Sequence, residues 1–382
     1  MQRVPHLAVD PALSPCGNAA VRGTLSRMCC VTFSDAAGPK GPAVVVCLLL
    51  FLLVACGDDD TDRGTRAAGR DDLPRTPAVP REIVLDLPVD PDLAEFSGLT
   101  WWGDRLVLLP QYPKTFGEDG AGALLTIDRE RLRRYVEGRD TSAIRPSTLP
   151  FDDGGLGTRV TGWDGYEAVA TDGDRIFLSV ECRTPEGWEG LIVRGRIEGD
   201  PPRVVVDPLL RTHLAGASGA PNFSEEALLV QGDEVWSVHE LNGRRVNPAP
   251  VATRMNQQLE VLEPWPFPPI EYRITDATAT DAERRFWVIN QFWPGDAARV
   301  QALRDELVLI DRPGGRPVER LVALRALEGR VVIDTTQGLV ELVTREDDVT
   351  RNWEGIARWD DTGFLLVTDR HPRTIFAYVE RR

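Results

Sequence analysis

NWEGIARWDDTGFLLVTD, residues 352–369, is the clearest copy of a pattern that the chain repeats five times. An acidic residue (a serine in one copy) and a small residue open an apolar strand, a turn with Gly or Asp follows, and a second apolar strand ends on a polar residue. Gly and Asp favour tight hairpins, and strands this apolar are typical of sheets buried on both faces. The other copies are EFSGLTWWGDRLVLLPQ (95–111), GYEAVATDGDRIFLSVE (165–181), FSEEALLVQGDEVWSVHE (223–240) and ITDATATDAERRFWVINQ (274–291).

The residues between the copies indicate two further strands in each repeat. After the second copy come GLIVRGRI (190–197) and PRVVVD (202–207), and after the fourth come ELVLID (306–311) and VERLVAL (318–324). Four strands per repeat, recurring along one chain, are the signature of a β-propeller blade. We therefore expect an all-β fold, a β-propeller with five visible four-stranded blades. An irregular β-sandwich is the alternative.

The start of the domain is expected to close the ring. The last repeat offers only three strands, and EIVLDLPV (82–89) is available as the fourth. An N-terminal strand that completes the last blade would hide the free strand edges. RVVIDTTQGLVELV (330–343) leaves a sixth blade possible. Short helices are expected as surface insertions at 128–136 and 296–305.

The N-terminus carries an export signal in this interpretation. Residues 43–55 are apolar for about the length of a signal-peptide core, too short to predict a membrane-spanning helix. LVAC (53–56) follows and resembles a bacterial lipobox, which predicts lipidation of Cys56. Several acyl chains on one residue would anchor the protein stably to a membrane. An ordinary secretory signal with a chance cysteine is the alternative.

These features divide the chain into four parts. Met28 is a plausible true start, so we treat what precedes it as an upstream mis-start extension. The acidic stretch after Cys56 contains Pro and Gly and has no apolar periodicity, which indicates a disordered tether. The expected boundaries are 1–27 for the extension, 28–56 for the lipoprotein signal peptide, 57–80 for the tether and 81–382 for the propeller domain.

Charge and cysteine content exclude several classes of protein. The 382-residue chain has a net charge of −15 and no basic stripe, so we expect no nucleic-acid partner. Only Cys182 follows Cys56, which excludes an intramolecular disulfide and a cysteine-based metal site from the mature domain. Cys182 is expected to pack as a small apolar side chain. We expect a monomer.

The polar ends of the repeated strands predict one shared site. The first strand of each hairpin starts where the second ends, so both sets of polar residues would converge near the propeller axis. So many carboxylates can stay together only if a cation neutralises them, an arginine pairs with them, or their pKa values rise. The expected group comprises Ser97, Glu167, Glu226, Asp276 and Glu354 at the strand starts, and Gln111, Glu181, Glu240, Asn290, Gln291 and Asp369 at the strand ends.

Oxygen ligands favour Ca²⁺ or Mg²⁺ over zinc, and we expect Glu167, Glu226, Asp276 and Glu354 to be the ligands. Basic residues follow the same strand ends, and arginine binds phosphate through two parallel hydrogen bonds. Arg183, Arg244 and Arg370 are therefore expected to bind a small anionic ligand. The alternative is that the acids only brace neighbouring blades.

Two histidines flank the expected site. His239 and His371 lie beside Glu240 and Asp369, where either could act as a general acid or base. We expect them, with Glu226, to be the catalytic residues. The alternative is that each histidine caps the end of a strand.

Three of the copies resemble a known family. GYEAVA (165–170), NFSEEALL (222–229) with EVWSVHE (234–240), and NWEGIA (352–357) with LLVTD (365–369) are similar to motifs of the phytase-like β-propeller family, described as having "esterase-like activity of phytase". The resemblance implies an exported bacterial protein. It also implies that Glu167, Glu226 and Glu354 are functional positions. Ser97 and Asp276 depart from the glutamate pattern.

Two functions are therefore expected from the sequence. The first is an envelope-anchored lipoprotein, facing the periplasm or the cell surface, that hydrolyses phosphoester or ester bonds with a bound Ca²⁺ or Mg²⁺. The second is a non-enzymatic propeller that binds a small ligand or an envelope protein. Fold similarity alone does not choose between them.

Overall fold

The computed structural model describes most of the chain beyond the expected tether. The described residues belong to one compact unit. The expected signal peptide, Cys56 and the tether up to residue 72 lie outside the described residues. The described ranges are 73–90, 94–117, 121–185, 187–215, 223–303, 305–307, 316–343 and 350–381.

The described strands form five groups in chain order. The first two groups are β3 (Phe96–Trp102), β4 (Arg105–Pro110), β5 (Gly122–Asp128) and β6 (Ser147–Asp152), then β7 (Trp163–Asp172), β8 (Arg175–Thr184), β9 (Gly187–Glu198) and β10 (Arg203–Ala215). Within each group neighbouring strands are antiparallel. The outer strands β6 and β10 pair in parallel, which joins the two groups into one eight-stranded sheet.

The remaining three groups repeat this order. They are β11 (Glu225–Gln231), β12 (Glu234–His239), β13 (Val251–Asn256) and β14 (Trp265–Pro266); β15 (Arg273–Ala277), β16 (Arg285–Phe292), β17 (Val318–Leu327), β18 (Arg330–Ile333) and β19 (Leu339–Leu342); and β20 (Trp353–Trp359), β21 (Gly363–Thr368) and β22 (Phe376–Glu380). The hairpins expected from the five sequence copies are all present.

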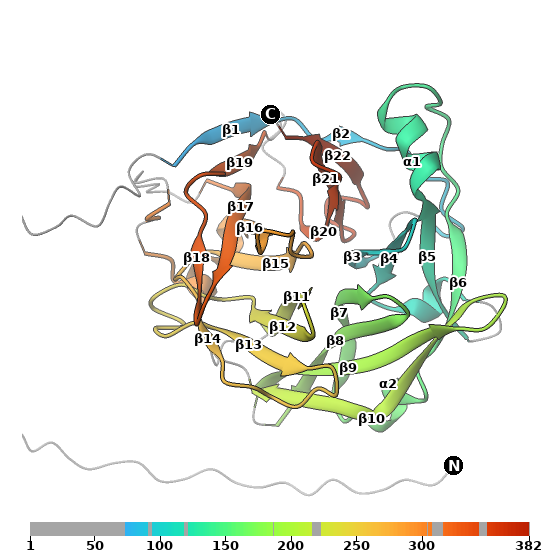
Figure 1. The fold of residues 1–382 in the computed structure, drawn as a ribbon, viewed down its shortest axis with the longest axis horizontal. Helices are drawn as coiled ribbons and strands as arrows, with labels where there is room; N and C mark the ends of the chain where they lie inside the picture. Colours follow the sequence, from blue (N-terminus) through green and yellow to red (C-terminus); the bar gives the residue numbers. More distant parts are fainter. Residues whose placement is uncertain are drawn as a thin grey trace, which may run out of the picture. The chain divides into compact units, whose positions relative to one another are not determined.

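The first strands of the five groups face one another around a common axis. β3 contacts β7, β7 contacts β11, β11 contacts β15, β15 contacts β20, and β20 returns to β3, as Figure 1 shows. This closed ring is a β-propeller arrangement. The expectation that residues 330–343 could form a sixth blade is wrong, because β18 and β19 both pair with β17 in the fourth group. The expected strand at 306–311 lies mostly outside the described residues.

Two N-terminal strands complete the sheets. β2 (Arg81–Glu82) pairs with β22, and the Ile83 N–H donates to the Phe376 carbonyl at 2.7 Å. The closing strand is present but shorter than expected, because Leu85 instead bridges Ile144. β1 (Arg75–Ala78), inside the expected tether, pairs in parallel with β19 (Figure 1). Its side chains are mostly outside the core, so hydrophobic periodicity could not reveal it.

The helices are short insertions. α1 (Arg129–Val136) is at its expected position. The other expected helix is reduced to the 3₁₀ turn η4 (Pro294–Asp296) and α3 (Ala297–Val300). η3 (Pro113–Thr115) and α2 (Leu156–Arg159) complete the set within the described ranges. Nowhere in these ranges is a helix both long and apolar enough to cross a bilayer.

A bulge at the start of each inner strand positions the repeated acidic residues. The pairing register shifts across Ser97, Glu167, Glu226 and Glu354, and it shifts across both Thr275 and Asp276 in the fourth group. An extra residue on one strand bends it locally and turns a side chain away from the sheet face. The bulges therefore explain why a polar column precedes strands that are otherwise apolar.

The small residue after each bulge lets the inner strands approach closely. A Cβ added to Gly355 would lie 2.7 Å from Val367 Cγ1 and 3.1 Å from the Gly98 carbonyl carbon.

Cys182 packs as expected, buried in the core of the second group. Burial raises the pKa of its thiol to about 11, which keeps it from being a reactive thiolate.

Gly355→Val is expected to reduce the free energy of unfolding by about 1–3 kcal/mol, the usual cost of overpacking a tight core. Gly355→Ala should have a smaller effect, since it adds one atom instead of three. Urea unfolding of the purified chain measures both. Equal stability of Gly355→Val and the wild type would contradict the close approach of β20 to β3.

Candidate functional site

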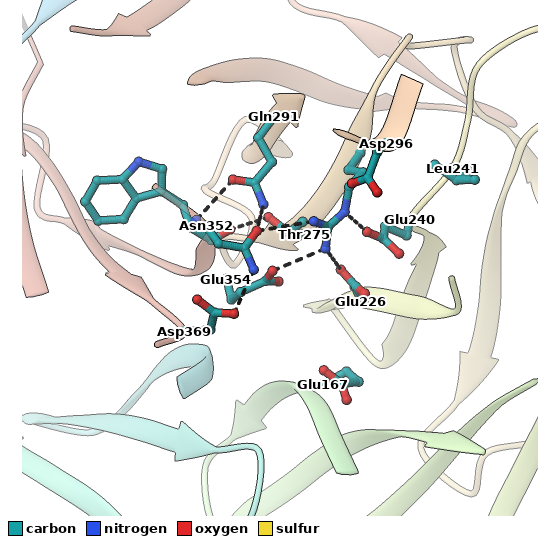
Figure 2. Close-up of polar contacts among 12 residues, drawn as sticks. Glu167, Glu226, Glu240, Leu241, Thr275, Gln291, Asp296, Asn352, Glu354 and Asp369 are labelled. Carbon is teal, nitrogen blue, oxygen red and sulfur yellow. Dashed lines mark hydrogen bonds and ion pairs between the residues drawn. The ribbon is translucent and has the colours of Figure 1, made fainter. Parts of the chain in front are cut away.

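One half-buried arginine holds three buried glutamates at the propeller axis. Arg273 is the first residue of β15, and its Nε donates to Glu240 Oε1. One of its terminal nitrogens, Nη2, lies 3.2 Å from Glu354 Oε1 and 3.6 Å from Glu226 Oε2. The three carboxylates come from β11, the end of β12 and β20, so the guanidinium joins three blades. Figure 2 shows Glu226, Glu240 and Glu354 pointing toward this shared centre.

Asn352 extends the network toward the fifth blade. Its Oδ1 accepts from Arg273 Nη1 at 3.2 Å and from Gln291 Nε2 at 2.8 Å, and its Nδ2 donates to Asp369 at 2.9 Å. The side-chain oxygen Oε1 of Gln291 in turn accepts from the backbone N–H of Trp353 at 3.0 Å. Two amides of fixed orientation therefore position Arg273 and Asp369 (Figure 2).

Two more glutamates face the axis from the second blade. Glu167 accepts from Gln111 Nε2 at 2.8 Å and stands apart from the arginine network in Figure 2. Glu181, at the end of the expected second hairpin, is buried nearby and interacts electrostatically with Glu167 and Glu240. We call Glu167, Glu181, Glu226, Glu240, Glu354 and Asp369 the axial carboxyl cluster. The convergence expected from the sequence is confirmed for these six.

Four glutamates of the cluster have raised pKa values. Burial raises the pKa of Glu354 to about 8, with the Arg273 charge opposing and Asp369 adding to the shift. Burial is the main cause that raises the pKa of Glu181 to about 7, and the neighbouring Glu240 charge is the second. The pKa values of Glu167 and Glu226 are raised well above their ordinary range, mainly by burial. One arginine against six acids cannot keep them all ionised, so the cluster carries protons at neutral pH.

Several carboxylate oxygens in the cluster have no hydrogen-bond donor among the described residues. They are Glu181 Oε1, Glu226 Oε2 and Glu240 Oε2, all buried. Buried polar atoms are usually paired, and leaving them unpaired costs free energy. The cluster therefore favours whatever supplies donors: its own protons, a cation, or a ligand with hydroxyl or amino groups.

A pocket of about 250 Å³ opens beside the arginine. Arg273, Gln291 and Asn352 line it together with the half-exposed ring of Trp293 and with His371. The remaining lining residues are Phe292, Asp296, Arg299 and Thr350. The pocket gives a small ligand a route to the network that orients the cluster.

Asp276 does not join the cluster, contrary to the expectation that it is a metal ligand. Its carboxylate accepts from the backbone N–H groups of Ala277 at 2.8 Å and Ile356 at 2.7 Å. The two-residue bulge in β15 turns Asp276 toward β20, so it braces two blades. Asn290 likewise binds the backbone of Glu271 and Arg273 instead of facing the axis.

The positive charge at the centre belongs to Arg273. The guanidinium lies between Glu226 and Glu354, two of the expected Ca²⁺ ligands. Within the part of the chain that the structure describes, no three acidic, histidine or cysteine residues are grouped so as to hold a metal ion. Calcium or magnesium binding therefore stays a prediction.

The two expected catalytic histidines have different surroundings. The Nδ1 of buried His239 accepts from the Leu241 N–H at 2.9 Å. His371 is exposed and lines the pocket, and its backbone N–H donates to Asp369 at 2.5 Å. His371 is therefore within the site, whereas the structure shows no contact of the His239 ring with the cluster among the described residues.

The three expected anion-binding arginines do not meet. Arg183 lies over the Trp188 ring at 5.8 Å. Arg244 pairs with Glu306 at 3.1 Å, and Arg370 pairs with Glu95 at 2.8 Å. Binding of an anionic ligand by these arginines stays a prediction.

Sequence reasoning missed Arg273 and Asn352. A signal for Arg273 was present, since a ring of acids requires a cation and this arginine directly precedes the one copy that has aspartate in place of glutamate. Asn352 is the first residue of the last copy, and no sequence pattern distinguishes it from a surface polar residue.

Comparisons with known proteins concern the fold. No family model matches the chain, and no curated protein matches it. Solved structures that match include the soluble aldose sugar dehydrogenase of Escherichia coli in its apo form, with 11% identity, a TM-score of 0.41, and coverage of 80% of this chain and 100% of that chain. A GH43_1 enzyme from Xanthomonas citri matches with 11% identity and a TM-score of 0.42, covering 79% and 91%.

An exo-1,5-α-L-arabinanase from a bovine ruminal metagenomic library matches with 10% identity, a TM-score of 0.41, and coverage of 75% of this chain and 92% of that chain. These neighbours are β-propeller proteins. At such low identity and TM-score they say nothing about activity, and the resemblance to phytase-like propellers finds no support in these comparisons. The chain is a β-propeller protein, as its own closed ring of strand groups shows.

Proposed function

We propose that this protein is a lipid-anchored hydrolase of the bacterial envelope that cleaves ester or phosphoester bonds. Its working part would be a five-bladed propeller with the axial carboxyl cluster as the acid–base centre. The observation that carries the proposal is the pair of buried carboxyls that titrate near neutrality, Glu354 at about 8 and Glu181 at about 7. A general acid or base is most effective when its pKa lies near the working pH.

Glu354 would act as the general acid. At pH 7 a carboxyl with a pKa of about 8 is mostly protonated, so it can donate to the leaving oxygen of an ester. Arg273 and Asn352 hold the surrounding network in place, and the adjoining pocket would admit the substrate. Such positioning is what general acid catalysis requires.

Glu181 would act as the base. With a pKa of about 7 it is partly ionised at neutral pH and can accept a proton from water. The water oxygen then bonds to the carbonyl carbon or phosphorus, the ester bond breaks, and the leaving alcohol takes the proton of Glu354. A proton passing from Glu181 to Glu354 through the cluster restores the starting state, so atoms and charge balance.

Glu354→Gln is expected to lower hydrolysis of p-nitrophenyl acetate or p-nitrophenyl phosphate by at least a hundredfold, the usual contribution of a general acid. The amide has nearly the same shape but no acidic proton. Steady-state rates of the purified chain from pH 5 to 9 measure the effect, and the alkaline limb of the wild-type profile should reflect the pKa of about 8.

Glu225→Gln is the matched control. Glu225 is also buried and begins β11 next to Glu226, but its carboxylate accepts from the Ser237 hydroxyl, outside the axial network. It should hydrolyse both esters like the wild type. Equal activity of Glu354→Gln and the wild type, or no hydrolysis of either ester by the wild type, would count against the proposal.

A second candidate function is non-enzymatic ligand binding at the envelope. The observation that favours it is that Arg273 satisfies most of its donors within the protein, on Glu240, Glu354 and Asn352. An arginine used in this way can simply brace three blades. The ester assay separates the two, because a binding propeller shows no turnover while the pocket beside Arg273 still takes up a ligand.

A further inference from the structure

A second pocket lies between the first and second strand groups, and Arg273 is not among its lining residues. It has a volume of about 510 Å³, within the range of small-molecule sites. Its walls come from β6, β7, β10 and the segment that follows β4. None of its lining residues belongs to the axial carboxyl cluster.

Aromatic rings form one wall of this pocket. Tyr112 meets Trp163 edge to face at 5.9 Å between ring centroids, and Trp163 meets Tyr166 in the same way at 5.8 Å. Phe151 packs against Tyr166 at 5.3 Å. The mutual packing holds the rings rigidly, so a ligand can bind against them at little cost in conformational entropy.

The same pocket carries polar groups of both signs. Asp152 and Asp153 contribute two carboxylates, and Lys114 and Arg203 contribute two cations. Both oxygens of Asp153 accept from backbone N–H groups of the following turn, while Asp152 uses one oxygen in this way and is exposed. Arg203 forms a loose, exposed pair with Glu198 at 3.7 Å. The charges balance, so the pocket favours neither an anion nor a cation.

Two buried donors in the pocket wall also lack acceptors. Trp163 Nε1 and the hydroxyl of Tyr166 have no hydrogen-bond partner among the described residues. Tyr166 is 1% exposed, so its hydroxyl has lost its hydrogen bonds to water and gains none from the described residues in exchange. Burial raises the pKa of this hydroxyl further and keeps it a donor.

We propose that this pocket binds a neutral saccharide ring. A sugar ring presents C–H groups that pack against aromatic faces, and hydroxyls that both donate and accept. Its hydroxyls would donate to Asp152 and accept from Lys114 and Arg203, so one uncharged ligand uses both signs of charge. An aromatic carboxylate would leave Asp152 facing a like charge, and a purely apolar ligand would bury these polar groups without partners.

The proposal does not depend on the function of the axial cluster. The two sites are nonetheless close in the chain, because Tyr112 follows Gln111, whose amide binds Glu167. The Tyr112 hydroxyl donates to the Asp164 carbonyl at 2.9 Å, which fixes the ring between the pocket and the axis.

Calorimetric titration of the full chain with maltotriose, cellotriose and xylotriose tests the proposal. At least one trisaccharide should bind saturably, and Trp163→Ala should weaken that binding at least tenfold. Trp293→Ala, in the pocket beside Arg273, is the matched control and should leave the affinity unchanged. Asp152→Asn changes only an exposed carboxylate and should weaken binding several-fold, so it carries the test if Trp163→Ala fails to fold.

Three results would overturn the proposal: no saturable binding of any of the three sugars, binding that is unchanged in Asp152→Asn, or binding that is lost in Trp293→Ala instead. Saturable binding of benzoate in the same titration, without binding of the sugars, would assign the pocket to an aromatic anion. The ester assay is separate, so loss of sugar binding and loss of hydrolysis are distinguishable.

Discussion

Arg273→Met is expected to lower the free energy of unfolding at pH 7 by about 3–5 kcal/mol, the usual cost of removing one partner from a buried charge network. The guanidinium is the one cation that Glu226, Glu240 and Glu354 share in the described network. Without it these carboxyls must bind protons or remain charged and unpaired in the interior. The loss should therefore shrink as the pH falls toward 5.

Urea unfolding at pH 5 and pH 7 measures this effect. Arg203→Met is the matched control, because Arg203 is exposed and its pair with Glu198 spans 3.7 Å. Surface pairs of this kind contribute about 0–1 kcal/mol. Adding Glu240→Gln to Arg273→Met should recover part of the stability. A loss below about 1 kcal/mol in Arg273→Met would show that the arginine does not brace the blades.

The wild-type chain is expected to become less stable as the pH rises from about 5 to 8. The folded pKa values of Glu354 and Glu181, about 8 and about 7, lie above the ordinary value of 4.5. In this window the folded state holds protons that the unfolded state releases. The stability present below the unfolded pKa is lost as the pH rises, by about 1.4 kcal/mol per pH unit for each proton.

Other carboxyls do not reverse this trend, because further carboxyls with raised pKa values act in the same direction. Hydrogen bonds and ion pairs lower the pKa values of Glu234 and Asp281, so their contributions disappear only as the pH falls below their ordinary values near 4. Urea unfolding at intervals of half a pH unit gives the slope. Glu354→Gln should have a shallower slope, since it removes one of the protons. Stability that increases between pH 5 and 8 would contradict the raised pKa values.

The sequence predicted most of the propeller because each hairpin is determined by residues that are close together in the chain. The turn residues, the apolar strands and the polar ends repeat in all five copies, and the described hairpins follow them. The polar column was visible for the same reason, since a bulge at Glu167, Glu226 and Glu354 recurs at the same point of each motif.

What the sequence could not predict depends on contacts between blades. Arg273 differs from a surface arginine only in the three glutamates around it, which come from other strands. The double bulge that turns Asp276 toward Ile356 changes the facing of one side chain without changing the motif. β1 is held by parallel pairing with β19, a partner far along the chain. It has no apolar periodicity that would reveal it in the sequence.

Carbon-13 NMR of the glutamate side-chain carboxyls, followed from pH 4 to 10, tests the central claim that the axial carboxyl cluster holds protons at neutral pH. The chain is expected to show a carboxyl resonance that titrates with a pKa of about 8 and is absent from Glu354→Gln. It should also show a second that titrates near 7. If every glutamate carboxyl instead titrates within about one unit of the ordinary value, the cluster is fully ionised at pH 7 and cannot act as an acid–base centre.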